Sequence, residues 1–185
     1  MKLNFSEIEN WQEFENLATS FFEKISKDKN DAIEVFVEPS GTGSDGGRDI
    51  LVTTNVNDSF VSYKRKWVVQ CKFYDKDLSK SELSDINIPS LIHEHGADGY
   101  LLICKKGVTS PLSNQFEDFR KSCRMNKNYL IWTGSQFLDK LILHRDIIQR
   151  YFPLYFKETY IKTNVETIYN EAYEKFSNEI KTDLP

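Results

Sequence analysis

Residues 41–72 constrain the fold more than any other part of the chain. A glycine-rich turn at residues 41–47 leads into the β-branched run 49–54, and a second apolar run follows at residues 67–73. Apolar runs of this kind, bounded by Gly and Asn/Asp clusters, predict paired β-strands. We therefore expect two neighbouring central strands, joined by a hairpin-type connection that contains residues 55–58 and 63–66.

The second run carries two polar residues at alternate positions, Gln70 and Lys72. Side chains alternate along a strand, so these two share one face while Val69 and Cys71 share the other. A lysine inside so apolar a strand is costly unless it is paired or used. Asp49 begins the neighbouring strand and is expected to face the same point. The three residues therefore predict a functional site at one edge of the sheet.

The N-terminal part predicts an amphipathic helix that starts at the capping-box pair Ser6 and Glu9. Its apolar arc comprises Ile8, Trp11, Phe14, Leu17, Ala18, Phe21, Phe22 and Ile25. Glu15 falls inside this arc, where a carboxylate needs a cation, a metal or a hydrogen-bond network. The alternative is that Glu15 lies at the edge of the apolar stripe and reaches water.

The remaining pattern predicts a strand at residues 33–37, a helix from Ser79 that Pro89 bends or splits, and alternating strands and helices from residue 99 to residue 151. This order favours an α/β sandwich with a mixed sheet. We expect one domain at residues 1–152 and a C-terminal helical extension or connector at residues 153–185, capped by Thr163.

Composition excludes several classes of protein. The formal net charge of −4, with a pI of about 5.5, argues against non-specific nucleic-acid binding by net charge alone. The three cysteines form no CxxC pair, which disfavours a zinc site and suits a reducing cytosol. Without a signal peptide or a membrane-spanning run, we expect a soluble cytoplasmic protein.

The glycine turn satisfies the spacing GxGxxG at Gly41, Gly43 and Gly46, but a strand-like run follows it where a dinucleotide site needs a helix. Its acids instead suit metal-assisted phosphodiester hydrolysis with Mg²⁺, or Mn²⁺ as an alternative. The expected ligands are oxygens of Asp49, Gln70, the Cys71 backbone and Glu15, with Asp45 assisting. Lys72 would then hold the attacking water or balance the charge of the phosphate.

Three motifs together resemble a known family: residues 11–18 with Phe14 and Glu15, residues 43–49, and residues 69–72. They are similar to the Mrr-type restriction endonuclease domain of the PD-(D/E)xK nuclease superfamily, over roughly residues 6–120. The resemblance implies a restriction-endonuclease-like core with a central mixed β-sheet flanked by helices, and Mg²⁺-dependent DNA cleavage in defence or repair. By position, Asp49 matches the motif acid, Gln70 and Lys72 match a QxK variant, and Glu15 matches the first-helix glutamate.

The function expected from these observations is a Mg²⁺-dependent endodeoxyribonuclease that acts on double-stranded DNA as a homodimer or larger homo-oligomer. Lys64, Arg65 and Lys66 are candidate contacts to DNA phosphates, although such a run is most often a solvated turn. Because Gln70 replaces the usual acid, the alternative is a weakly active or inactive nuclease-fold module for DNA binding or assembly. A further alternative is the effector part of a larger antiviral sensor.

Overall fold

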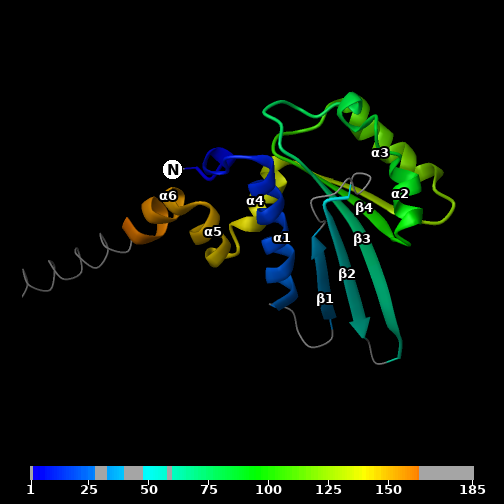
Figure 1. Ribbon diagram of the computed structural model, residues 1–185, viewed down its shortest axis with the longest axis horizontal. Coiled ribbons are helices and arrows are strands. Elements are labelled where there is room, and N and C mark those ends of the chain that lie inside the picture. Colours follow the sequence, from blue (N-terminus) through cyan, green and yellow to red (C-terminus); the bar gives the residue numbers. More distant parts are fainter. Residues whose placement is uncertain (1, 28–32, 40–47, 58–59, 163–185) are drawn as a thin grey trace, which may run out of the picture.

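The computed structural model describes residues 2–27, 33–39, 48–57 and 60–162, which form a five-stranded sheet with helices on both faces (Figure 1). In spatial order the strands are β1 Ile33–Pro39, β2 Ile50–Asn57, β3 Ser62–Lys72, β4 Gly99–Cys104 and β5 Asn128–Trp132. Strands β1, β2 and β3 are antiparallel neighbours, whereas β3, β4 and β5 run parallel. The predicted α/β fold with a mixed central sheet is confirmed.

The sheet separates two hydrophobic cores, and β3, its middle strand, contributes side chains to both. Val69 and Cys71 lie in the core beneath the N-terminal helix, whereas Val68 lies in the core on the opposite face. This alternation is the one that the sequence predicted. The two central strands are antiparallel neighbours, as a hairpin-type connection requires, but the predicted bounds of that connection are wrong, because residues 55–57 belong to β2 and residues 63–66 belong to β3. The ladder of backbone hydrogen bonds outweighs their polar composition.

Helix α1, Trp11–Lys27, covers the first core. The members of the predicted arc that are buried are Ile8, Phe14, Leu17, Ala18, Phe21 and Phe22. Trp11, the first residue of the helix, is instead 55% exposed.

The predicted start of this helix at Ser6 is wrong. Residues Phe5–Glu7 form a separate 3₁₀ turn, in which Asn4 Oδ1 accepts the Ser6 N–H at 2.8 Å. The helix itself starts after Asn10, whose Oδ1 accepts the Glu13 N–H at 2.9 Å. Asn and Ser are comparable N-cap residues, so local propensity did not decide between the two starts.

Two helices cover the second core: α2 Ile88–Glu94 and α3 Ser110–Ser122. The helix predicted from Ser79 is wrong in extent. Its capping box with Glu82 is present but starts only the four-residue 3₁₀ helix Lys80–Leu83. Pro89 lies in the first turn of α2, where its missing N–H breaks no hydrogen bond.

The C-terminal part of the described chain packs on the first core. It comprises α4 Gly134–Leu141, α5 Arg145–Tyr151, α6 Pro153–Phe156 and a π-helical turn at Lys157–Ile161. Tyr155 and Phe156 are buried in that core, so packing continues past residue 152. The helix predicted from Thr163 lies outside the described residues, and the domain boundary stays a prediction. None of the described helices combines the length and apolarity that a bilayer crossing requires.

Candidate active site

Asp49 lies at the end of the sheet where β2 begins and β3 ends. Its backbone N–H donates to the Val69 carbonyl at 3.0 Å, and its Oδ2 accepts the Cys71 N–H at 2.6 Å. Burial raises the pKa of Asp49, while the Cys71 N–H and the Lys72 charge oppose that rise. The carboxylate is thus oriented by the strand that carries the other predicted site residues.

Glu15 brings a second carboxylate to this point from α1. Its side chain is half-buried, between the core-facing and solvent-facing sides of the helix. The pKa of Glu15 is raised to about 7, by burial first and then by the negative charge of Asp49, while the charge of Lys72 acts to lower it. Glu15, Asp49 and Lys72 therefore act on one another electrostatically, and we call Glu15 and Asp49 the acid pair.

Gln70 and Lys72 lie on the same face of β3, as their spacing predicted, but their surroundings differ. Gln70 is 2% exposed, and its Oε1 accepts the hydroxyl of Tyr100 on β4. Lys72 is half-buried at the last position of the strand. Tyr100 was missed by sequence reasoning, since only the parallel register of β3 and β4 places it opposite this region. One lone pair of the amide oxygen is thus occupied by a protein donor.

Cys71 contributes backbone, and its side chain points into the first core. Burial raises the pKa of its thiol well above the usual value, and the nearby acid pair adds to that effect. The thiol is therefore protonated and is no ligand for a hard cation. Its N–H already donates to Asp49. The backbone carbonyl oxygen of Cys71 is therefore the atom left as a neutral ligand, as the sequence suggested.

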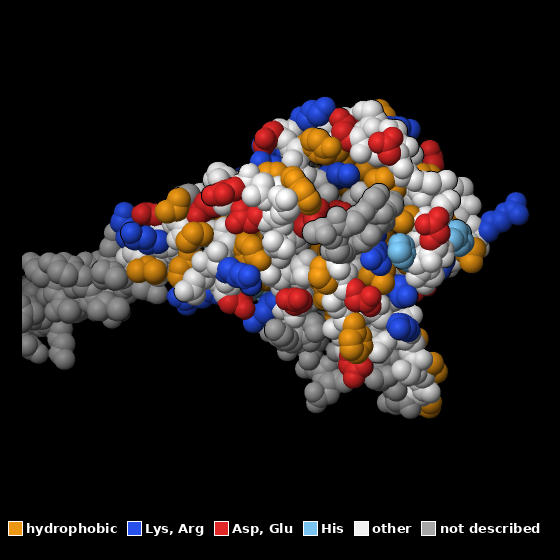
Figure 2. Space-filling model, viewed as in Figure 1, with side chains coloured by type: hydrophobic (Ala, Val, Ile, Leu, Met, Phe, Trp, Pro, Cys, Tyr) orange, Lys and Arg blue, Asp and Glu red, His pale blue; other side chains and the backbone are white. Residues whose placement is uncertain are grey.

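The basic residues divide between the two faces of β3. Lys64 and Lys66 lie on the same face of β3 as Gln70 and Lys72. Arg65 lies on the other face, and its Cζ is 5.4 Å from the centroid of the Tyr63 ring. Figure 2 shows Lys and Arg side chains near the histidines of the α2 region. The three residues therefore do not form one contact surface.

The fit of this site to a metal ion rests on its donor set. Among the residues that the structure describes, no three His, Cys, Asp or Glu side chains cluster as metal ligands. The acid pair nevertheless offers hard carboxylate oxygens, and their pKa values are raised. A divalent cation beside them would stabilise the charged carboxylates and lower those pKa values. Asp45 and the glycine turn lie outside the described residues. The residues present thus fit a hard divalent cation.

Comparisons with known proteins give the family of this chain. The family model "Mrr_cat: Restriction endonuclease" matches residues 7–139. Among solved structures, the chain is similar to the MspJI restriction endonuclease in complex with a 27-mer oligonucleotide, with a TM-score of 0.50 and 13% identity over 80% of this chain and 31% of that chain. It is also similar to the DNA modification-dependent restriction endonuclease AspBHI, with a TM-score of 0.42 and 12% identity over 76% of this chain and 38% of that chain.

The chain spans only about a third of the length of these two structures. No curated protein sequence matches it. At this level of identity the structural likeness establishes the fold, and the family assignment comes from the match over residues 7–139. With the fold, the order of the motifs and the family match in agreement, this chain belongs to the Mrr_cat restriction endonuclease family.

Proposed function

We propose that this protein is a metal-dependent endonuclease that hydrolyses phosphodiester bonds in double-stranded DNA. Family membership implies a nuclease. The observation that carries the proposal is the acid pair beside Lys72, in which burial raises the pKa values of both carboxylates and the charge of Asp49 raises that of Glu15 further. Strongly perturbed carboxylates beside a lysine are typical of catalytic sites.

In this proposal Asp49, Glu15 and the Cys71 carbonyl hold a Mg²⁺ or Mn²⁺ ion, with Asp45 as a further ligand. The bound cation supplies the positive charge that polarises the phosphate and acidifies water. Asp49 is oriented for this role by the Cys71 N–H. Lys72 places its ammonium beside the acid pair, where it orients the attacking water and balances the charge that builds on the phosphate oxygens.

The biological setting that suits this chemistry is restriction or antiviral defence in the cytoplasm. Cutting both strands calls for two sites, so we propose a homodimer or larger homo-oligomer. The oligonucleotide named with MspJI supports DNA as the substrate. The chain's short coverage of both solved relatives suits a nuclease unit that works with a fused or associated sensor domain.

The test is cleavage of supercoiled plasmid with and without Mg²⁺ or Mn²⁺. We expect metal-dependent nicking by the wild type and at least about a hundredfold loss in Asp49→Asn and in Lys72→Gln, since losing one preorganised charge in a catalytic site costs this much. Glu23→Gln changes an exposed acid on the same helix as Glu15 and should cut like the wild type. Cutting at the wild-type rate by both site variants would refute the assignment.

One observation favours a second candidate, a nuclease-fold module that binds DNA or assembles without cutting it. Gln70 stands where the superfamily usually has an acid, and its amide oxygen is engaged by Tyr100. The metal site then has one charged ligand fewer. This candidate predicts DNA binding at every Mg²⁺ or Mn²⁺ concentration with no product, so the same titration separates the two.

A further inference from the structure

A second feature lies at the same end of the sheet as the acid pair. A groove of about 1220 Å³ opens at the carboxyl ends of the parallel strands, between the N-terminal segment and the segments that follow β4 and β5. Its lining includes the apolar side chains of Phe5, Leu138 and Tyr155 and the basic side chains of Lys2, Lys105 and Lys106. A lining that is both apolar and basic suits a ligand that carries both rings and phosphates.

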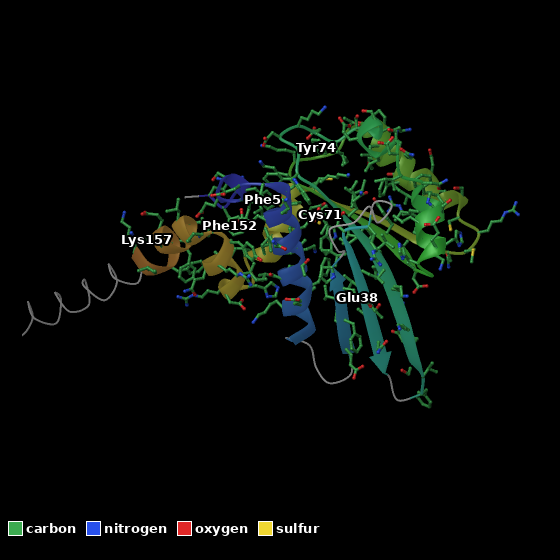
Figure 3. All side chains as sticks on the ribbon, viewed as in Figure 1. Phe5, Glu38, Cys71, Tyr74, Phe152 and Lys157 are labelled. Atoms are coloured by element: carbon green, nitrogen blue, oxygen red, sulfur yellow. The ribbon has the colours of Figure 1, made fainter. Side chains whose placement is uncertain are left out.

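Backbone and ring contacts connect residues that line the groove to the strand that carries the candidate active site. The Lys105 N–H donates to the Lys72 carbonyl at 2.9 Å, so the strand end that carries Lys72 also begins the groove wall. Aromatic rings link the two on the α1 side: the Phe5 and Phe14 centroids are 5.2 Å apart, and those of Phe14 and Phe73 are 5.4 Å apart. Figure 3 shows Phe5 and Cys71 near the same end of α1.

The three lysines are not equivalent. Lys105 is held in place, because its Nζ lies 2.7 Å from Asp75 Oδ1 and 3.9 Å from the centroid of the Phe73 ring, with 14% of the side chain exposed. Lys2 and Lys106 are exposed and form no ion pair within the described residues. Two acids, Asp75 and Asp139, also line the groove, and Asp75 is the one paired with Lys105. The charges left to meet a ligand are those of Lys2 and Lys106.

The groove is also preformed. The Gly134 N–H donates to the Lys106 carbonyl at 2.8 Å, which joins the segment after β5 to the segment after β4. A Cβ at position 134 would lie 2.0 Å from the Lys105 carbonyl oxygen, so only glycine permits this approach. A ligand therefore meets a wall that is already in place.

Size decides between a small ligand and a polymer. The volume exceeds the range of about 300–1,000 Å³ that is usual for small-molecule pockets. Strand β5 lies two interstrand spacings of about 4.8 Å from β3, which is roughly 10 Å from the strand that carries Lys72. At about 3.4 Å per nucleotide along a duplex strand, that is about three nucleotides.

We propose that this groove binds the backbone of the DNA strand being cut, within about three nucleotides of the scissile phosphate, with Lys2 and Lys106 as the phosphate contacts. This inference rests on the proposed nuclease function. It assigns DNA affinity to a defined surface of a protein whose net charge is −4. It also separates two roles at one edge of the sheet: the acid pair and Lys72 for chemistry, and the groove for positioning.

The experiment measures binding without cleavage, so its failure is distinguishable from failure of the nuclease assignment. The full chain with Asp49→Asn is titrated with a fluorescent duplex in EDTA, by anisotropy, over about 50–200 mM salt. Adding Lys2→Gln and Lys106→Gln should reduce the slope of log affinity against log salt by about 1.8, at about 0.9 for each lost phosphate contact. Lys157→Gln, an exposed lysine far from Cys71 in Figure 3, is the control and should leave the slope unchanged.

A variant that keeps both lysines provides a second readout. Ser135→Glu places a negative charge in the wall and should weaken duplex binding about fivefold. Unchanged slope and affinity in both variants, with melting temperatures equal to that of the parent, would overturn the proposal. The proposal would also be overturned if these variants lost binding of a free mononucleotide that the parent binds, while their duplex binding stayed intact. The groove would then be a small-ligand pocket.

Discussion

Replacing Glu15 by glutamine should stabilise the metal-free protein, and only at neutral to alkaline pH. The pKa of Glu15 is raised from its usual 4.5 to about 7, by burial first and then by the charge of Asp49. The folded state therefore binds this proton more tightly than the unfolded state. The stability that results is fully present below about pH 4.5 and is lost as the pH rises through about 7.

The size of the effect follows from the shift. A change from 4.5 to about 7 corresponds to at most about 3.4 kcal/mol, at about 1.36 kcal/mol for each unit of pKa. Glu15 is only half-buried, so solvent screening reduces this to about 1 kcal/mol. For a chain of 185 residues, 1 kcal/mol is about 2–4 °C in Tm. The neutral amide avoids this cost and keeps the shape of the side chain.

The assay is thermal unfolding in EDTA at about pH 5 and about pH 8.5, with Glu23→Gln as the control on the exposed side of the same helix. We expect the Tm gain of Glu15→Gln over the wild type to be about 2–4 °C larger at the higher pH. Mg²⁺ should reverse the order, because a cation that binds only the folded state stabilises the wild type more than the variant.

An equal Tm difference at the two pH values would refute this reasoning, since an effect without pH dependence does not come from the charge of Glu15. A gain of the same size in Glu23→Gln would refute it as well. If Mg²⁺ stabilised the wild type and Glu15→Gln by the same amount, Glu15 would not be a metal ligand. The acid pair would then be a structural feature of the fold.

Two further predictions concern β3 and its neighbour. Tyr100→Phe leaves the buried amide oxygen of Gln70 without its donor and should cost about 1–3 kcal/mol in the free energy of unfolding, measured by urea denaturation; a loss below about 0.5 kcal/mol would mean that this hydrogen bond contributes little. If DNA also follows the face of β3 that carries Lys72, Lys64→Ala with Lys66→Ala should lower the salt slope of duplex binding by up to about 1.8. Arg65→Ala, on the opposite face, should leave that slope unchanged, and equal effects from both variants would contradict the division between faces.

Much of the fold could be predicted because the strong signals are local. Strand alternation placed Val69 and Cys71 on one face and Gln70 and Lys72 on the other, and the two cores follow that division. Helical spacing placed Glu15 among buried residues, where the structure has it half-buried. These patterns are set by backbone geometry, which the sequence encodes directly.

What the sequence did not predict depends on contacts between distant segments. Tyr100 reaches Gln70 only through the parallel register of β3 and β4, which no local pattern fixes. The basic residues were expected in a turn because their composition is polar, yet backbone pairing extends β3 back to Ser62. Trp11 fits the apolar arc but is 55% exposed, because helical spacing alone does not show where other segments cover the helix.

The hydrogen bond from the Lys105 N–H to the Lys72 carbonyl has one more consequence. It makes the reacting end of β3 and the wall of the groove parts of the same rigid body, so neither can shift by more than a fraction of an ångström without breaking the link. DNA bound as proposed would therefore have to adapt its own shape to this edge of the protein. Discrimination among substrates would then depend on how easily each one bends, as well as on the bases it carries.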